Sequence, residues 1–425
     1  MNEFIVPLSA AEAADAERFG PKAANQAALG HAGIPIPGGY GIDAEAYRAQ
    51  MRALGLVDAA RSVFSTDDFA ARRHALDVRL GLLDQPIDER IAEPLLEAWR
   101  ELMSTPDTLG VVRSSALVED RYGSSFAGQF ESFLGLQDEN EFLVAVRSCW
   151  CALWSSRALR YMATHDLDPA DTAMALALQP LVDARVSGGG LSRTAEGDML
   201  LSATWGLGSA IAQGEVVPDR YVVSREGKLL DMATGRKTHS VSCVHSNQQV
   251  DRSVAEEPCL DAEQISELAD YLVRAEDVVG GAAEIEWALD AAGIKLVQAR
   301  PLHMEEAHVP DEVWEKRPRL RGHPAGVGWG TGTARVVNCE CEISRVGPGD
   351  VLVTRVAGPA LTHILPQVSA VVAELGGSTS HLASLARERG IPMVLGVLDA
   401  TNTIPEGSTV AVDGVAGIVR WMGSE

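Results

Sequence analysis

A charged, proline-containing segment, residues 303–320, divides this chain into two parts of different sequence texture and so constrains the fold most. Its sequence, HMEEAHVPDEVWEKRPRL, has little apolar periodicity and is typical of a linker. Residues 1–302 mix helical and strand patterns, whereas residues 321–425 consist of short β-rich runs separated by Gly and Pro. We therefore predict an α/β (α+β) chain with a domain at 1–302, a linker at 303–320 and a compact domain at 321–425.

The charge and composition exclude several classes of protein. The 425 residues carry 36 basic and 59 acidic side chains, a formal charge of −23, which argues against a general nucleic-acid or anionic-membrane binder. No apolar run is long enough to span a bilayer, and the N-terminus has no signal-peptide pattern, so we expect a cytoplasmic protein. The six cysteines, including the pairs Cys149/Cys151 and Cys339/Cys341, are expected as reduced thiols rather than metal ligands.

Periodicity predicts a small set of elements that place the motifs below. Residues 20–33 are expected to form a Gly-rich entry followed by an Ala-rich helix. Further helices are expected at 141–162, 262–279 and 382–389, and a hairpin at 283–288 and 294–299. Strands are expected in the second part at 350–355, 370–375, 393–397, 408–414 and 417–422.

The sharpest motif is Gly376-Gly377-Ser378-Thr379-Ser380-His381, which follows a predicted strand and opens the helix at 382–389. Backbone N–H groups at a Gly-rich helix start form an anion site, and a His placed there can act as a nucleophile whose phosphorylated form they hold. A His that merely caps the helix is the alternative, and the Gly-Gly-hydroxyl context favours the chemical role.

Two further stretches suit a Mg²⁺–nucleotide. Arg113 lies between Val112 and Ser114-Ser115, which combines a cation with hydroxyl donors, although a turn with a surface Arg is an equal alternative. Glu284 and Glu286 share one face of a predicted strand, and Gln298 and Arg300 share a face of its partner. A solvated hairpin with cross-strand Glu–Arg pairs explains the second pattern equally well. No Gly-x-x-x-x-Gly-Lys-[Ser/Thr] loop is present, so an ordinary P-loop NTPase is disfavoured.

The ordered set of motifs resembles the phosphoenolpyruvate synthase / pyruvate phosphate dikinase superfamily, which includes rifampicin phosphotransferase. The motifs are Lys22, Arg-Ser-Ser-Ala at 113–116, Phe-Ala-Gly-Gln at 126–129, Glu-Ile-Glu-Trp at 284–287, Gln-Ala-Arg-Pro at 298–301 and Gly-Gly-Ser-Thr-Ser-His at 376–381. The resemblance covers nearly the whole chain. It implies an ATP-grasp-type nucleotide-binding domain at 1–302 and a small swivelling β/β/α phosphohistidine domain at 321–425.

The resemblance also implies a role for individual residues. His381 corresponds to the phosphorylated histidine, and Thr379, at a position that is a regulatory phosphosite in some dikinases, is expected to act as a loop donor. Gly206-Leu207-Gly208, Gly214 and Asp219 are expected to be structural. Glu286 and Gln298 correspond to the metal-binding residues, with Mg²⁺ and ATP as cofactors. The ATP-contacting residues implied are Lys22, Arg113, Gly128, Ser132, Phe133, Gln179, Glu286, Gln298 and Arg300.

The resemblance implies an ATP-dependent phosphotransferase that converts ATP to AMP and phosphate through phosphohistidine. The sequence departs from the family pattern at Glu284, usually Asp and a second metal-ligand candidate, and at Pro21, usually Gly. No stretch corresponds to the family's acceptor-binding part, so the phosphoryl group is expected to pass to a small-molecule acceptor, bound between the domains or presented by a partner subunit.

Three alternatives remain open at this point. One is an ATP-dependent condensing ligase or dehydratase that activates its substrate by phosphorylation. Another is the phosphohistidine-generating subunit of a split phosphoenolpyruvate synthase-like or phenylphosphate synthase-like system. The third is a non-catalytic nucleotide-binding regulator, against which the full set of ATP-contacting residues and His381 weighs.

Overall fold

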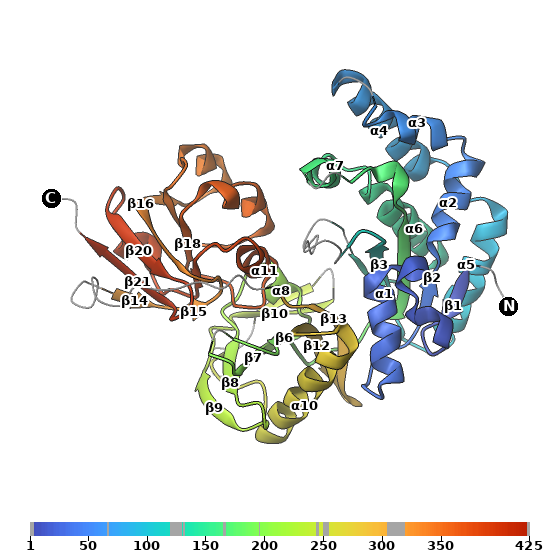
Figure 1. Ribbon diagram of the computed structural model, residues 1–425. Coiled ribbons are helices and arrows are strands. Elements are labelled where there is room, and N and C mark those ends of the chain that lie inside the picture. The colour runs from blue at the N-terminus through green and yellow to red at the C-terminus, as the bar shows by residue number, and fades with distance from the viewer. Residues whose placement is uncertain are drawn as a thin grey trace. The chain divides into compact units, whose positions relative to one another are not determined.

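The computed structural model forms two compact units, which are described separately here (Figure 1). Unit 1 comprises Met1–Val182 and Lys295–Arg300, and unit 2 comprises Asp183–Ile294 and Pro301–Glu425. Residues 304–318 of the predicted linker lie outside the described residues, and the predicted domain boundaries stay a prediction. The structure describes residues 4–65, 68–119, 130, 132–164, 167–194, 196–243, 246–249, 255–303 and 319–422.

Unit 1 is built on a five-stranded sheet with strand order β1-β2-β5-β3-β4, in which all described pairings are antiparallel. Its strands are β1 (Ile5–Pro7), β2 (Tyr40–Ile42), β3 (Gly110–Ala116), β4 (Ser132–Leu136) and β5 (Met174–Pro180). Its helices are η1 (Ala11–Ala14), α1 (Ala16–His31), α2 (Ala44–Ala53), α3 (Val57–Ser62), α4 (Asp68–Asp84), α5 (Glu89–Leu102), α6 (Glu139–Ala152), α7 (Ser156–Thr164) and η2 (Pro169–Asp171).

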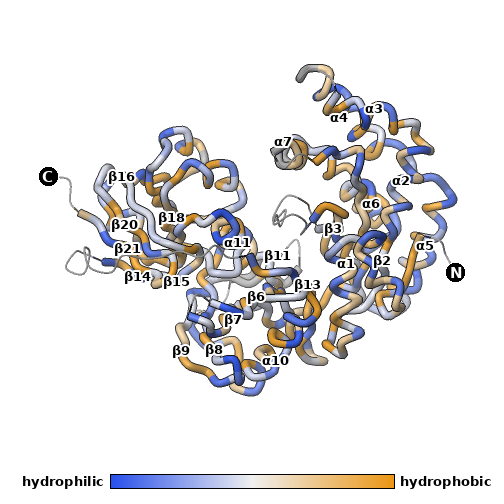
Figure 2. Tube along the Cα trace, viewed as in Figure 1, coloured by the Kyte–Doolittle hydropathy of each residue, from blue (hydrophilic) through white to orange (hydrophobic). Residues whose placement is uncertain are grey.

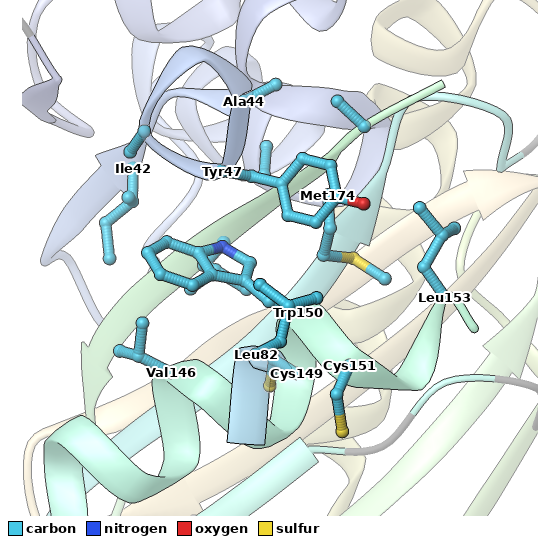
Figure 3. Packing of buried hydrophobic residues seen from close by; sticks show 14 of the residues in the cluster. Ile42, Ala44, Tyr47, Leu82, Val146, Cys149, Trp150, Cys151, Leu153 and Met174 are labelled. Atoms are coloured by element: carbon cyan, nitrogen blue, oxygen red, sulfur yellow. The ribbon is translucent and has the colours of Figure 1, made fainter. Parts of the chain in front are cut away.

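The core of unit 1 forms where α2 and α6 pack against the sheet (Figure 3). The rings of Tyr47 and Trp150 meet edge to face at 6.4 Å between centroids, and both side chains are buried. Trp154 donates its indole N–H to the Tyr47 hydroxyl at 2.8 Å, which satisfies two buried polar groups at once. Burial raises the pKa of Tyr47 further above its usual range, so this phenol stays protonated.

Unit 2 contains a six-stranded sheet with strand order β13-β12-β6-β7-β8-β9. The described pairs β12–β6, β6–β7, β7–β8 and β8–β9 are antiparallel. The strands are β6 (Val186–Leu191), β7 (Met199–Trp205), β8 (Asp219–Val223), β9 (Leu229–Ala233), β12 (Ala283–Asp290) and β13 (Gly293–Pro301), accompanied by the pair β10 (His239–Cys243) and β11 (Ser246–Gln249) and the helices α8 (Ser209–Ala212) and α10 (Ala262–Val279).

Helix α10 and the hairpin β12–β13 confirm two sequence predictions. The helix has the predicted bounds, because Asp261 and Gln264 form a reciprocal capping box and Gly280 ends the helix in the left-handed conformation. Hydrophobic and hydrophilic residues both occur along it (Figure 2). Ile265, Leu268 and Leu272 form its buried face. The hairpin is present and longer than expected.

Unit 2 also contains an eight-stranded sheet with strand order β14-β21-β20-β16-β17-β18-β19-β15. Parallel pairs run from β16 through β17 and β18 to β19, and antiparallel pairs join the other strands. The strands are β14 (Arg319–Arg321), β15 (His323–Pro324), β16 (Trp329–Val337), β17 (Val351–Thr354), β18 (Ala370–Ala373), β19 (Met393–Leu395), β20 (Thr409–Asp413) and β21 (Ile418–Met422), and the helices are η3 (Glu340–Arg345), η4 (Pro359–His363), η5 (Leu365–Gln367), α11 (His381–Glu388) and α12 (Ala400–Thr403).

These elements confirm the predicted α/β class and all five strands expected after residue 321. Strand β16 was not predicted, because its glycines mask the strand pattern. Gly330 and Gly332 are required there: a Cβ would lie 2.2 Å from the carbonyl oxygen of Ser369 and 2.1 Å from that of Gly349.

Three expectations are corrected by the structure. The helix expected at 141–162 is two helices, α6 and α7, because the chain turns at 153–155 and Ser155 Oγ then accepts the N–H of Ala158. The helix expected from Gly20 begins earlier, at Ala16, and Gly20 (φ 69°) forms a kink inside it. Cys339 and Cys341 are not reduced thiols but a disulfide, with Cα atoms 5.3 Å apart.

No helix in the part of the chain that the structure describes combines the length and the apolar character needed to cross a bilayer.

Candidate functional site

In unit 1 the start of α1 packs against the end of β3, which brings Lys22 to the Arg113-Ser114-Ser115 stretch. Gly20 approaches Ser115 so closely that a Cβ would lie 2.3 Å from the Ser115 carbonyl oxygen. The Ser115 hydroxyl accepts the N–H of Ala23 at 3.2 Å. Ser114 and Ser115 are both buried, so at least Ser115 serves to join these two elements.

Lys22 pairs with Glu119, an acidic residue to which the sequence assigned no role. The Lys22 Nζ lies 2.7 Å from Glu119 Oε1, and the side chains are 21% and 1% exposed. Glu119 also accepts the N–H of Ala116 at 3.0 Å, which fixes the carboxylate at the end of β3. The buried carboxylate therefore orients an ammonium group that still reaches solvent, an arrangement suited to a lysine that meets an anionic ligand.

Residues 295–300 of β13 also pack in unit 1, alongside α1. The amide N–H of Leu296 donates to Pro35 O at 2.8 Å, and Asn25 Nδ2 donates to Ala299 O at 3.1 Å. Alternation along the strand places Gln298, half-buried, and Arg300, 9% exposed, on one face, as the sequence predicted.

Gln179 joins β5 to α1 through its side-chain amide. Its Nε2 donates to Gln26 Oε1 at 3.3 Å and to Gly38 O at 3.2 Å, and Gln26 in turn donates to Leu296 O at 3.3 Å. Gln179 is 2% exposed, so it holds these segments together; its predicted contact with adenine stays a prediction.

The nucleotide-contacting loop predicted around Gly128 is only partly described. Gly128 lies outside the described residues. Ser132 is exposed on β4 opposite Arg113, and Phe133 is half-buried and packs against the core of unit 1. Arg113 and Ser132 therefore occupy paired positions on neighbouring strands, and their predicted contacts with the nucleotide stay predictions.

In unit 2 the predicted phosphohistidine loop leads from β18 into α11, and His381 is the first helical residue. Ser380 is the N-cap, with its hydroxyl accepting the N–H of Ala383 at 3.3 Å. His381 is half-buried, and the six residues before it include Gly376 (φ 103°). The strand, Gly-rich loop and helix order predicted from the sequence is confirmed here.

The helix that carries His381 contacts the strand that carries Glu284 and Glu286. Glu284 Oε1 accepts the Ser384 hydroxyl at 2.8 Å and Arg387 Nη2 at 3.3 Å. The Arg387 and Glu284 side chains are 3% and 8% exposed. Glu284 and Glu286 alternate onto the same face of β12, so the half-buried Glu286 lies on the face that meets α11.

Glycines of β6 let the phosphohistidine loop approach the same sheet. Gly189, paired with Glu286 in register, has no Cβ, and one placed there would lie 2.7 Å from Thr379 Cβ. On the other side of the loop, Gly376 N donates to Val216 O at 3.1 Å. A Cβ at Gly377 would lie 2.5 Å from Pro218 Cγ. The loop is therefore seated on the six-stranded sheet by close backbone contacts.

Asp219, expected to be structural, lies at the centre of a buried polar network. It pairs with Lys237, with both side chains fully buried, and accepts N–H groups from Gly235 at 2.7 Å and Cys259 at 2.8 Å. The Tyr221 hydroxyl donates to it at 3.2 Å. Burial, with the Asp219 charge second, raises the pKa of the Cys259 thiol, so that cysteine stays protonated and inert.

No group of three or more His, Cys, Asp or Glu side chains gathers as a metal cage among the residues described here. A Mg²⁺–nucleotide site needs only one or two carboxylates together with phosphate oxygens and water. Glu286 and Gln298 supply oxygen atoms of the required hard type.

The two parts of the chain match two described protein domains. Residues 16–319 match the pyruvate phosphate dikinase AMP/ATP-binding domain, and residues 346–417 match the mobile domain of PEP-utilising enzymes.

Curated relatives match over nearly the whole chain. The phosphoenolpyruvate synthase of Aeropyrum pernix is 31% identical, with 94% of this chain and 56% of that protein covered. The enzyme of the same name from Pyrococcus furiosus is 31% identical over 95% of this chain and 57% of its own length. A probable phosphoenolpyruvate synthase of Methanothermobacter thermautotrophicus is 29% identical over 94% and 61%. The chain thus spans less than two thirds of the length of these relatives.

Proposed function

Because this chain belongs to the phosphoenolpyruvate synthase and pyruvate phosphate dikinase superfamily, we propose that it is an ATP-dependent phosphotransferase acting through phosphohistidine at His381. The observation that carries the proposal is the contact of Glu284 with Ser384 and Arg387. This contact holds the helix of His381 against the sheet face that bears Glu286.

The first half-reaction transfers a pyrophosphoryl group from ATP to the histidine. A ring nitrogen of His381 attacks the β-phosphorus, the bond from that phosphorus to the α–β bridging oxygen breaks, and AMP leaves with the bond's electron pair. Water then attacks the terminal phosphorus, which releases inorganic phosphate and leaves phospho-His381. The histidine must be neutral to attack, and its nitrogen becomes neutral again when the phosphoryl group departs.

The cationic side chains of unit 1 bind and orient the triphosphate. Lys22, held by Glu119, and Arg113 of β3 provide positive charge where the phosphate oxygens gain negative charge. Arg300, nearly buried on β13, adds a third cation, and Gln179 and Phe133 are proposed to contact the nucleoside. Glu286 and Gln298 would hold Mg²⁺, which would neutralise further phosphate charge.

The second half-reaction passes the phosphoryl group from His381 to an acceptor. The relatives are named phosphoenolpyruvate synthases, and we propose a small-molecule acceptor here as well, reached when the domain with α11 swings away from the six-stranded sheet. The acceptor is either bound by this chain or presented by a partner subunit, and the reaction takes place in the cytoplasm.

The test uses ATP carrying ³²P at the β-phosphate, with AMP release and acid-labile protein label as readouts. Wild-type chain should become labelled, His381→Ala should not, and Glu286→Ala should lose labelling while keeping its thermal midpoint. Equal labelling of wild type and His381→Ala would refute the phosphohistidine. ATP binding without labelling of wild type or of any variant would instead indicate a non-catalytic nucleotide-binding regulator.

A further inference from the structure

Unit 2 contains a cavity of about 560 Å³ that lies between its two sheets. Its wall on one side comes from β8, β9 and the segment after β9, and on the other side from β14, β15 and the turn before β21. The volume is in the range of small-molecule sites. Neither His381 nor Glu286 is among the lining residues, and the helix of His381 reaches the cavity wall only through Arg387.

Three arginines from different elements converge on this cavity: Arg220 of β8, Arg236 after β9 and Arg321 of β14. Arg220 donates from Nη1 to Asp231 at 2.9 Å, and Arg236 donates from Nη2 to the Glu374 carbonyl at 3.2 Å. Asp231 is 64% exposed, so its pairing with Arg220 is a surface contact that a ligand can replace at little cost.

The charge balance of the wall is opposite to that of the chain. Arg387 also lines the cavity but is paired with Glu284, which leaves the three arginines above against Asp231 and Glu196. The whole chain has 59 acidic and 36 basic residues. A net positive wall on such a chain concentrates small anions locally, although the exterior repels them.

The remaining wall supplies neutral donors and backbone. His323 of β15 faces Arg220 and Arg236, and burial together with these two cations holds its pKa at about 4, so the imidazole is neutral at pH 7 and can donate one N–H. Leu398 and Val415 add apolar surface. Five lining glycines present backbone rather than side chains: Gly322, Gly326, Gly396, Gly414 and Gly417. This mixture is typical of a ligand site.

We propose that this cavity binds a small, multiply charged oxyanion of the dicarboxylate or phosphate class, held by the guanidinium groups of Arg220, Arg236 and Arg321. Arginine forks match the planar edge of a carboxylate or two oxygens of a phosphate. Arg220 belongs to the six-stranded sheet, Arg236 follows the last strand of that sheet, and Arg321 belongs to the eight-stranded sheet. We call the arrangement in which α11 lies against the six-stranded sheet the docked arrangement. A ligand that contacts all three arginines binds only the docked arrangement and therefore stabilises it.

Binding is tested by isothermal titration calorimetry of the full chain with sodium malonate and, separately, inorganic phosphate, each at constant ionic strength. Titrations are repeated with a saturating non-hydrolysable ATP analogue and Mg²⁺, which blocks the nucleotide site. We expect one saturable site for at least one probe. Arg236→Gln and Arg321→Gln should each weaken it by about tenfold or more, the loss typical of one charged hydrogen bond.

The matched control is Arg345→Gln, an exposed arginine of the same unit whose partners are surface acids. Its affinity should equal that of wild type, and thermal melts verify that each variant is folded. Malonate without phosphate binding identifies a dicarboxylate ligand, and the reverse identifies a phosphate ligand. The proposal is overturned if neither probe shows saturable binding. It is also overturned if Arg236→Gln and Arg321→Gln bind the probes with the same affinity as Arg345→Gln.

The docking consequence has its own readout. Amide hydrogen exchange of the α11 segment, 381–388, should slow at saturating malonate or phosphate in wild type and not in Arg321→Gln. His381→Ala should bind the probes like wild type. The two proposals therefore fail separately: loss of labelling leaves this site intact, and loss of anion binding leaves phosphohistidine formation intact.

Discussion

Replacing Glu284 by Ala should slow phosphohistidine formation without weakening ATP binding, because this carboxylate joins β12 to the helix of His381. It accepts hydrogen bonds from Ser384 Oγ at 2.8 Å and Arg387 Nη2 at 3.3 Å. With side-chain exposures of 3% and 8%, the Arg387–Glu284 pair is shielded from water and from salt. Its loss therefore acts directly on the docked arrangement.

The expected size of the effect depends on which hydrogen bonds Arg387 retains in the Glu284→Ala variant. A buried charge that loses its only partner costs about 3–5 kcal/mol. Arg387 still donates to Ser378 O, to Ala325 O at 3.3 Å and to Ser384 Oγ at 3.2 Å, so the full penalty does not apply. We expect about 2–3 kcal/mol, the range of hydrogen bonds to charged groups, which corresponds to a roughly 30- to 150-fold smaller docked population.

The assay is the rate of ³²P transfer from β-labelled ATP in a single turnover, with ATP affinity measured separately. Glu284→Ala should label about 30- to 150-fold more slowly, Glu284→Gln should be intermediate, and Glu257→Ala, at an exposed position of unit 2, should match wild type. The double variant with Ser384→Ala should be less defective than the sum of the single effects, because both remove one contact.

A metal-ligand role for Glu284 predicts a different outcome. A lost Mg²⁺ ligand is offset by raising Mg²⁺, whereas a lost docking contact is not. Rescue of Glu284→Ala by Mg²⁺, full additivity with Ser384→Ala, or labelling at the wild-type rate would each refute the docking argument.

Three other substitutions probe separate parts of the chain. Gly189→Val should block seating of the phosphohistidine loop and abolish labelling while ATP still binds; labelling at the wild-type rate would show that the loop does not need this approach. Lys22→Met should weaken ATP binding by about tenfold or more and lower the thermal midpoint by stranding the Glu119 carboxylate; adding Glu119→Gln should restore the midpoint and not the affinity. The pKa of His323 is about 4 in the folded chain and about 6.5 in the unfolded chain, so the unfolded chain binds more protons between these values and the free energy of unfolding falls as the pH drops from about 6.5 toward 4. In denaturant titrations across that window, the free energy of unfolding of His323→Gln should fall by about 1–2 kcal/mol less than that of wild type, a figure discounted for partial exposure.

Local sequence signals predicted those elements whose residues interact with near neighbours. Helix α10 has its predicted bounds because the capping box at Asp261 and Gln264 and the glycine at 280 are local. The loop, His381 and α11 were predicted for the same reason. By contrast, the break between α6 and α7 depends on a turn within an unbroken apolar pattern. Strand β16 was not predicted because it contains glycines that are required by close contacts with backbone distant in the sequence.

The side-chain pairs that the sequence did not predict join residues that lie far apart along the chain. Glu119 lies 97 positions from Lys22, and Glu284 lies 103 positions from Arg387. A single sequence carries no signal that pairs such residues, because the charge of each is equally suited to solvent. The same holds for the cavity arginines, which come from segments that only the fold brings together.

The run Gly188-Gly189-Gly190 in β6 contains a glycine that the contact with the phosphohistidine loop requires. Each glycine in a strand costs about 0.5–1 kcal/mol relative to Ala, so three in succession cost about 1.5–3 kcal/mol of stability. Gly188 is required within the sheet, since a Cβ would lie 1.8 Å from Ser202 O. Gly189 is different, because its nearest neighbour is Thr379 of the phosphohistidine loop at 2.7 Å. The three nearest heavy atoms to a Cβ at that position all belong to Thr379, so the cost of a glycine at 189 is offset by its contact with the phosphohistidine loop. Gly189→Ala should therefore raise the thermal midpoint or leave it unchanged while it slows labelling, and a variant that lowers both would show that Gly189 serves the sheet alone.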